Sequence, residues 1–143
     1  MTTALNTDAA QTGWLKIDIA GNATAGGVNS LGYILNPEGV ELQILDCYLY
    51  TTVASAAAAT LDIGINATAG SDDTDMCAAL AINAAAPNVK RICGGNVASE
   101  AALTGGQNGV KWGAAEYMCF YNPAAQISTA FRANLFVEYL RLA

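Results

Sequence analysis

The sequence predicts an all-β domain, an antiparallel β-sandwich or jelly roll of about seven or eight strands. The clearest evidence lies in residues 127 to 142, where apolar residues such as Leu135 and Val137 alternate with Asn134 and Glu138. Successive side chains of a strand point to opposite faces, so a period of two indicates a β-strand. Turn-rich segments separate similar stretches at intervals of about 8 to 15 residues, and no stretch predicts a long helix.

The first expected strand covers residues 14 to 19. Leu15, Ile17 and Ile19 lie on one face of it and alternate with polar residues and a tryptophan. Residues 21 to 27 consist of glycines and other small residues, which neither bury much area nor resist bending. We therefore expect a loop after this strand.

A strong turn follows a short expected strand at residues 32 to 35. Residues 36 to 39 read Asn-Pro-Glu-Gly, and here proline presets φ while glycine accepts conformations that other residues avoid. The turn predicts a hairpin with a long partner strand at residues 40 to 53. Both faces of that partner mix polar and apolar residues, which indicates a bulge or a change of sheet.

The remaining strands are shorter or weaker until the C-terminal end. Residues 60 to 65 form a compact apolar strand, residues 76 to 82 fit a strand or a short helix, and weak strand signals lie near Ile92 and at residues 98 to 103. Two clear strands, at residues 116 to 121 and in the C-terminal segment, complete the set. The inward side chains of the two clearest strands predict core positions at Leu61, Ile63, Ile65, Phe131, Leu135 and Val137.

The chain length predicts one sandwich domain at residues 13 to 143, preceded by an N-terminal arm at residues 1 to 12. The 143 residues are 53% hydrophobic and only 13% charged, whereas charged residues make up about a quarter of a typical soluble domain. The domain could be a tightly packed monomer with a weakly charged surface, or it could be a subunit with one surface covered by another protein. Low charge favours the covered subunit.

Charge and hydropathy restrict the partners. A net charge of -6 argues against nucleic acid and anionic membranes, which are bound by clustered Lys and Arg. No apolar run approaches the roughly 20 residues of a transmembrane helix. The first eight residues lack the basic and apolar regions of a signal peptide, so we expect synthesis in the cytoplasm without export.

Catalytic and metal-binding signals are weak. The sequence contains no histidine, which excludes Ser-His-Asp and Cys-His triads and the usual zinc and copper sites. Paired carboxylates could still hydrolyse a glycoside, but the acidic residues fall mainly on positions typical of a solvated face. We expect no catalytic residue, no bound metal and no cofactor.

The only carboxylate cluster contains Asp72, Asp73 and Asp75. Oxygen ligands close together in a loop suit Ca²⁺, but the glycine and closing glutamate of an EF-hand are missing. A solvated loop tip is the favoured interpretation, with calcium binding left open.

The four cysteines are Cys47, Cys77, Cys93 and Cys119. They are spaced too widely for a C-x-x-C ligand pair, and we expect buried free thiols.

Aromatic residues and the arm supply the candidate partner contacts. Two tryptophans and six tyrosines could form a sugar-stacking platform or anchors in a protein interface, although alternation within strands favours packing for most of them. The predicted partner contacts are Thr2, Asn6, Gln11, Trp14 and Trp112.

The order of motifs over residues 14 to 142 resembles small β-sandwich proteins of tailed bacteriophage virions. The motifs are the turn at residues 36 to 39, a long strand ending Tyr-Leu-Tyr-Thr-Thr, the strand of residues 60 to 65, an Asp-rich loop and a closing strand with Tyr139. The sequence is most similar to capsid decoration, or cement, proteins and related head-fibre proteins.

This resemblance implies a non-enzymatic jelly-roll subunit on the outer surface of a phage capsid. It would bind the major capsid protein, often as a dimer or trimer. The alternatives are a tail or fibre module, a single-jelly-roll shell protein, and a carbohydrate-binding or glycosidase domain.

Overall fold

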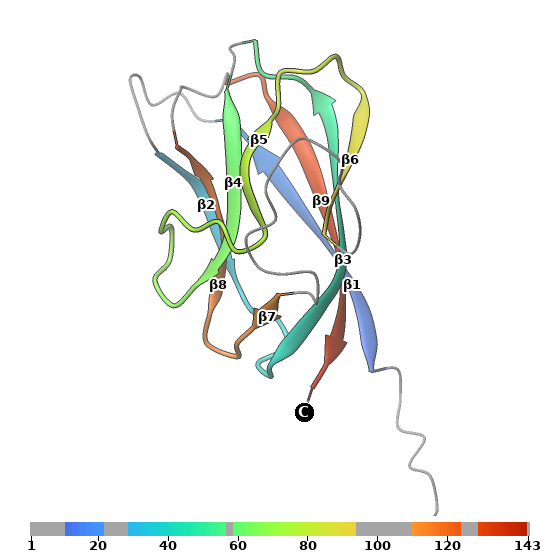
Figure 1. The fold of residues 1–143 in the computed structure, drawn as a ribbon, viewed down its shortest axis with the longest axis vertical. Helices are drawn as coiled ribbons and strands as arrows, with labels where there is room; N and C mark the ends of the chain where they lie inside the picture. The colour runs from blue at the N-terminus through green and yellow to red at the C-terminus, as the bar shows by residue number, and fades with distance from the viewer. Residues whose placement is uncertain (1–10, 22–28, 57–58, 94–109, 124–128, 143) are drawn as a thin grey trace, which may run out of the picture.

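The computed structural model of the chain describes residues 11–21, 29–56, 59–93, 110–123 and 129–142. Nine strands and no helix form within these ranges, which confirms the predicted all-β class (Figure 1). The strands are β1 (Thr12–Ala20), β2 (Asn29–Leu35), β3 (Leu42–Val53), β4 (Thr60–Asn66), β5 (Cys77–Ala81), β6 (Asn88–Cys93), β7 (Lys111–Trp112), β8 (Tyr117–Asn122) and β9 (Arg132–Arg141).

The strands form two antiparallel sheets that pack as a sandwich. Sheet A has the order β1-β9-β3-β6, with β7 paired to β3, and sheet B has the order β2-β8-β4-β5. The C-terminal strand β9 lies at the centre of sheet A, because it pairs with β1 on one side and with β3 on the other. The most strongly alternating segment of the sequence is therefore a central strand.

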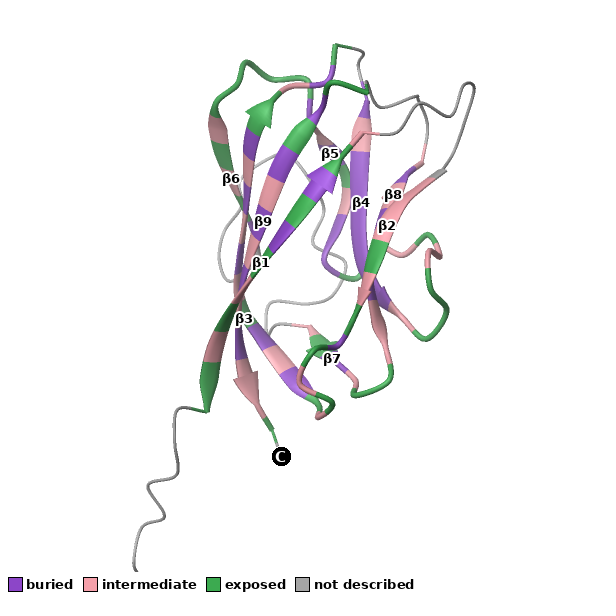
Figure 2. Ribbon diagram, turned by 180° about the vertical axis from the view of Figure 1, so that it is seen from behind, coloured by how far each residue is buried: buried purple, intermediate pink, exposed green. Residues whose placement is uncertain are grey.

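The core lies between the sheets and consists of the inward sets of the strands. Figure 2 shows buried positions alternating with less buried ones along β9, as a period of two requires. The predicted core positions are confirmed, since these side chains are between 0% and 6% exposed: Leu61, Ile63, Ile65, Phe131, Leu135 and Val137.

The expected hairpin at residues 36 to 39 is wrong. β2 pairs with β8 in sheet B, whereas β3 pairs with β9 in sheet A, so the turn carries the chain from one sheet to the other. The buried side chain of Asn36 stabilises this connection between the sheets. Its amide donates hydrogen bonds to the carbonyl oxygens of Val40 in the turn and of the distant Trp112 and Gly113.

Other boundaries differ by a few residues. The ambiguous segment at residues 76 to 82 is the strand β5, and the weak signal near Ile92 is the strand β6. The signal at residues 98 to 103 lies outside the described residues. Gln11 accepts a hydrogen bond from the N–H of Arg141 at 2.7 Å, and Thr12 begins β1, so both belong to the sandwich rather than to the predicted arm.

Candidate assembly surface

The outward side of sheet A brings aromatic side chains together in rows across four strands. Lys16, Phe136, Tyr48 and Arg91 are successive partners from β1 through β9 and β3 to β6, and Asp18, Asn134, Tyr50 and Val89 form the next row. Partners in register point to the same side of a sheet. Because the neighbouring positions on each strand are buried in the core, these rows face away from it.

We call this surface the aromatic face and define it by Trp14, Tyr48, Tyr50, Val89 and Phe136. Trp14 is 58% exposed and Val89 62% exposed, and the other three side chains are half-buried. Large apolar side chains that gather on one surface mark interaction sites, and aromatic residues are enriched in protein interfaces.

An ion pair fixes the aromatic face near β6. The Nε and a terminal nitrogen of Arg91 donate to the two carboxylate oxygens of Asp46 at 3.0 and 2.8 Å, and the Tyr48 hydroxyl donates to the same carboxylate at 2.9 Å. Burial alone would raise the pKa of Asp46, but hydrogen bonds from Arg91, the Cys47 N–H and Tyr48 outweigh it, so the pKa is lowered. The guanidinium also lies 5.8 Å from the centre of the Tyr48 ring, which holds that ring in one orientation.

The outward side of sheet B is covered instead. A Cβ on Gly64 would lie 2.5 Å from the carbonyl carbon of Asp73, so the loop between β4 and β5 packs directly on β4. Cys119 of β8 donates to the Thr68 carbonyl oxygen in the same loop at 3.7 Å. Among the described residues of sheet B, the large apolar side chains that reach solvent are Tyr33, 56% exposed, and Leu35, 47% exposed.

The acidic cluster serves this loop. Asp73 accepts hydrogen bonds from the Asn66 side chain and from the N–H of Asp75, and Asp62, only 4% exposed, accepts one from Ala79 at 2.6 Å. Burial raises the pKa of Asp62, and the negative charge of Asp72 raises it further. Asp73 holds the loop on β4 through Asn66, while Asp62 links β4 to β5 and is too buried to be open to a substrate.

No group of three His, Cys, Asp or Glu residues in the described ranges is placed to hold a metal ion.

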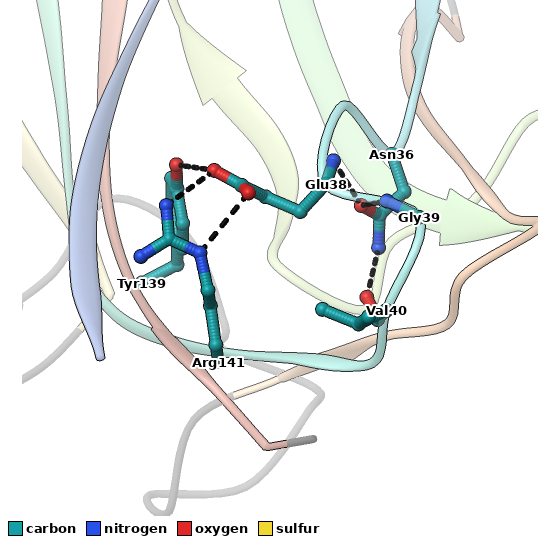
Figure 3. A network of polar contacts seen from close by, with 6 residues as sticks. All are labelled: Asn36, Glu38, Gly39, Val40, Tyr139 and Arg141. Carbon is teal, nitrogen blue, oxygen red and sulfur yellow. Dashed lines mark hydrogen bonds and ion pairs between the residues drawn. The ribbon is translucent and has the colours of Figure 1, made fainter. Parts of the chain in front are cut away.

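A second polar network closes the end of the sandwich near the turn (Figure 3). Glu38 accepts hydrogen bonds from the Tyr139 hydroxyl and from two nitrogens of Arg141, the latter at 3.0 and 2.7 Å. The hydrogen bond from Arg141 is the main cause of the lowered pKa of Glu38, and the hydrogen bond from Tyr139 lowers it further. A Cβ on Gly13 would lie 2.5 Å from the Tyr139 ring, so glycine in β1 makes room for the ring that reaches Glu38.

The predicted contact residues lie in different environments. Thr2 and Asn6 lie outside the described residues, while Gln11 and Trp14 are exposed at the start of β1. The structure corrects the expectation that Trp112 contacts a partner, because this side chain is 0% exposed and its indole N–H donates to the carbonyl oxygen of Glu116 at 2.9 Å. A side chain fully enclosed by its own domain cannot anchor a partner.

The remaining members of the aromatic face were not among the predicted contacts. Phe136 lies between the predicted core positions Leu135 and Val137, so alternation could have assigned it to the outward side of β9. The expected strand at residues 40 to 53 showed two mixed faces, because a bulge lies between Ile44 and Asp46, so alternation could not assign Tyr48 and Tyr50 to a surface or show that β3 and β9 are neighbours.

The cysteine prediction is confirmed for Cys119, which is free and buried. Cys47 and Cys77 are buried, as expected, while the side chain of Cys93 lies outside the described part of the chain.

The described part of the chain contains no helix long and apolar enough to cross a membrane.

The fold and the aromatic face define an all-β sandwich that presents large apolar side chains on the outward side of sheet A. No protein-family model matches the sequence, and no curated protein matches it either. Among solved structures, the chain is similar to a chain of the "Capsid of Ralstonia phage GP4", with a TM-score of 0.63 and 16% identity. The match covers 100% of this chain and 92% of that chain, so the two are similar in fold over all of this chain and most of the other.

Proposed function

We propose that this chain is a non-enzymatic structural protein of a bacteriophage virion, which decorates and stabilises the outside of the capsid by binding the major capsid protein. The observation that carries this proposal is the likeness in fold, over the whole chain, to a chain of a phage capsid. The aromatic face supplies the binding surface, and the two-sheet framework holds its side chains in place.

The surface chemistry suits a role in a lattice. In the row through Phe136 and Tyr48 the two rings lie on the central strands β9 and β3, and Lys16 and Arg91 lie at its two ends, as in an interface with an apolar core and a polar rim. One modest interface that is repeated many times over a shell gains strength through multivalency, without a catalytic group or a cofactor. A homodimer or homotrimer made in the host cytoplasm would raise this effect further.

Binding to shells tests the proposal. Purified chain should bind capsids assembled from the major capsid protein alone, and the double change Tyr50→Ser with Phe136→Ser should weaken that binding at least about tenfold. Tyr33→Ser removes a more exposed ring, from sheet B, and is the control, expected to bind as the parent does. Equal binding by all three proteins would reject the aromatic face, and no binding by the parent would reject decoration.

The arm has a separate test with a boundary set by the fold. Removing residues 1 to 10 leaves the contact between Gln11 and Arg141 in place, so the melting temperature should stay nearly constant. We expect weaker attachment to capsids, since a segment that orders on binding extends the contact beyond the sandwich. Unchanged affinity would show that the arm has no role in attachment.

A further inference from the structure

The open edge of β1 is the second surface of interest. β1 is the end strand of sheet A and pairs only with β9 among the described residues. The N–H of Gly21 donates to Phe131 and that of Arg141 donates to Gln11, so odd-numbered positions of β1 exchange hydrogen bonds with β9. In an antiparallel ladder the intervening positions point their N–H and C=O groups the other way; here they are Thr12, Trp14, Lys16, Asp18 and Ala20.

The end strands β2, β5 and β6 are interrupted and β7 has only two residues, whereas β1 is long and unbroken. The pairings skip Leu31 in β2, one residue between Cys77 and Leu80 in β5, and Ile92 in β6, so each of these strands contains a bulge. In β6, Lys90 also turns towards sheet B and donates to the Ala81 carbonyl oxygen at 2.8 Å. Bulges and inward-pointing lysines are the devices that keep sheet edges from pairing with other chains.

β1 lacks both devices. Its nine residues pair with β9 in unbroken register, from Thr12 opposite Leu140 to Ala20 opposite Arg132, and its two charged side chains point outward. A long, regular edge of this kind is a template for strand addition.

We propose that β1 pairs with β1 of a second copy of this chain, antiparallel and about a twofold axis at Ile17, to form a dimer with one continuous sheet. In this register Lys16 lies opposite Asp18 of the second copy, and the symmetry makes that pair twice. Shifting the register by two residues in either direction places Lys16 opposite Lys16 or Asp18 opposite Asp18, which repel. On the inward side the same register places Ile17 against Ile17 and Leu15 against Ile19, so the apolar layer continues across the junction.

The dimer adds a second binding surface to the proposed decoration protein, and its role on a capsid depends on that proposed function. Joining two sheets at β1 places two aromatic faces side by side on one surface. Two linked faces bind a lattice more tightly than one, provided that both can engage.

Charge reversal tests the register in solution, without capsids. Lys16 and Asp18 are 55% and 80% exposed and bridge each other within one chain at 3.2 Å, so changing them should leave the fold intact. In a dimer of Lys16→Asp, both positions 16 and 18 carry an acid, so each pair across the junction joins two negative charges. In a dimer of Asp18→Lys, both positions carry a lysine, so each pair joins two positive charges. By sedimentation velocity the parent should be a dimer and each variant a monomer, while an equimolar mixture of the two variants should form a heterodimer.

A backbone variant tests the edge independently of charge. Lys16→Pro removes an N–H that points to the open edge and leaves the hydrogen bonds to β9 in place, so it should give a folded monomer with a circular dichroism spectrum like that of the parent. A parent that stays monomeric at all concentrations, or variants that dimerise as the parent does, would overturn the proposal. Monomers that still bind capsids would leave the proposed function standing, and β1 dimers that bind no capsid would reject the function but not the dimer.

Discussion

At the residue scale, Asn36 joins two segments that are far apart in the sequence, its own turn and residues 112 to 113. Its amide nitrogen lies within 2.9 to 3.1 Å of the carbonyl oxygens of Val40, Trp112 and Gly113, and its carbonyl oxygen accepts from the N–H groups of Glu38 and Gly39. The side chain is 4% exposed, so water cannot readily replace it. This one amide holds the turn between the two sheets against β7.

The variant Asn36→Asp keeps the hydrogen bonds that this side chain accepts and removes those that it donates. The carboxylate can still accept from the turn, but it cannot donate and it faces the carbonyl oxygens of Trp112 and Gly113. Leaving buried polar groups unsatisfied should lower the free energy of unfolding by about 1 to 3 kcal/mol in urea denaturation. Asn134→Asp, on the outward side of β9, is the control and should have a much smaller effect; equal losses would contradict the role of Asn36.

Glu38 should make stability depend on pH in the acid range. Because its hydrogen bonds from Arg141 and Tyr139 hold its pKa below the ordinary 4.5, the folded state binds fewer protons than the unfolded state. The stabilisation is fully present above pH 4.5 and is lost as the pH falls through the lowered pKa. Melting temperatures measured downward from pH 6 should fall more steeply for the parent than for Glu38→Gln, whereas Glu41→Gln should follow the parent. Parallel curves for the parent and Glu38→Gln would contradict this linkage.

At the element scale, β9 is the central strand of sheet A and its inward side chains dominate one side of the core. Leu135 is 0% exposed, and removing its branched end should cost about 2 to 5 kcal/mol of unfolding free energy. Leu135→Ala can be compared with Asn134→Ala on the same strand, for which we expect less than about 1 kcal/mol. Similar losses in urea denaturation would mean that the two faces of β9 are not distinct.

The loop between β4 and β5 should control access to a buried thiol. Gly64→Ala would force a methyl group against the backbone of Asp73 and lift the loop, at a cost of about 1 to 3 kcal/mol. Burial raises the pKa of Cys119, so lifting the loop should lower that pKa and speed the reaction with a disulfide reagent at pH 8.

The extra reactivity should disappear when Gly64→Ala is combined with Cys119→Ser. A rate unchanged from that of the parent would show that the loop does not protect the thiol.

At the scale of the whole molecule, the sequence predicts the strands better than their partners. Alternation identified β1, β4, β8 and β9, because the period of two is a local property of the chain. It could not show that the turn after Leu35 joins two sheets, since pairing depends on distant residues such as Trp112 and Glu116.

The surface was predictable only in part for the same reason. The sequence could identify Trp14 as an exposed residue of a strand. It could not place Phe136 and Tyr48 on the same surface, because they come together only through the pairing of β9 with β1 and β3. Trp112 was misplaced because β7 has only two residues, too few for alternation to indicate a buried side.

The most direct test of the proposed virion role is electron cryomicroscopy of virus particles purified from the source of this chain. We expect density for the nine-stranded sandwich at repeated positions on the outside of the shell, with the aromatic face turned towards the major capsid protein. A map that resolves the side chains of the shell but contains no such density, from particles in which mass spectrometry finds no peptide of this chain, would contradict the proposal.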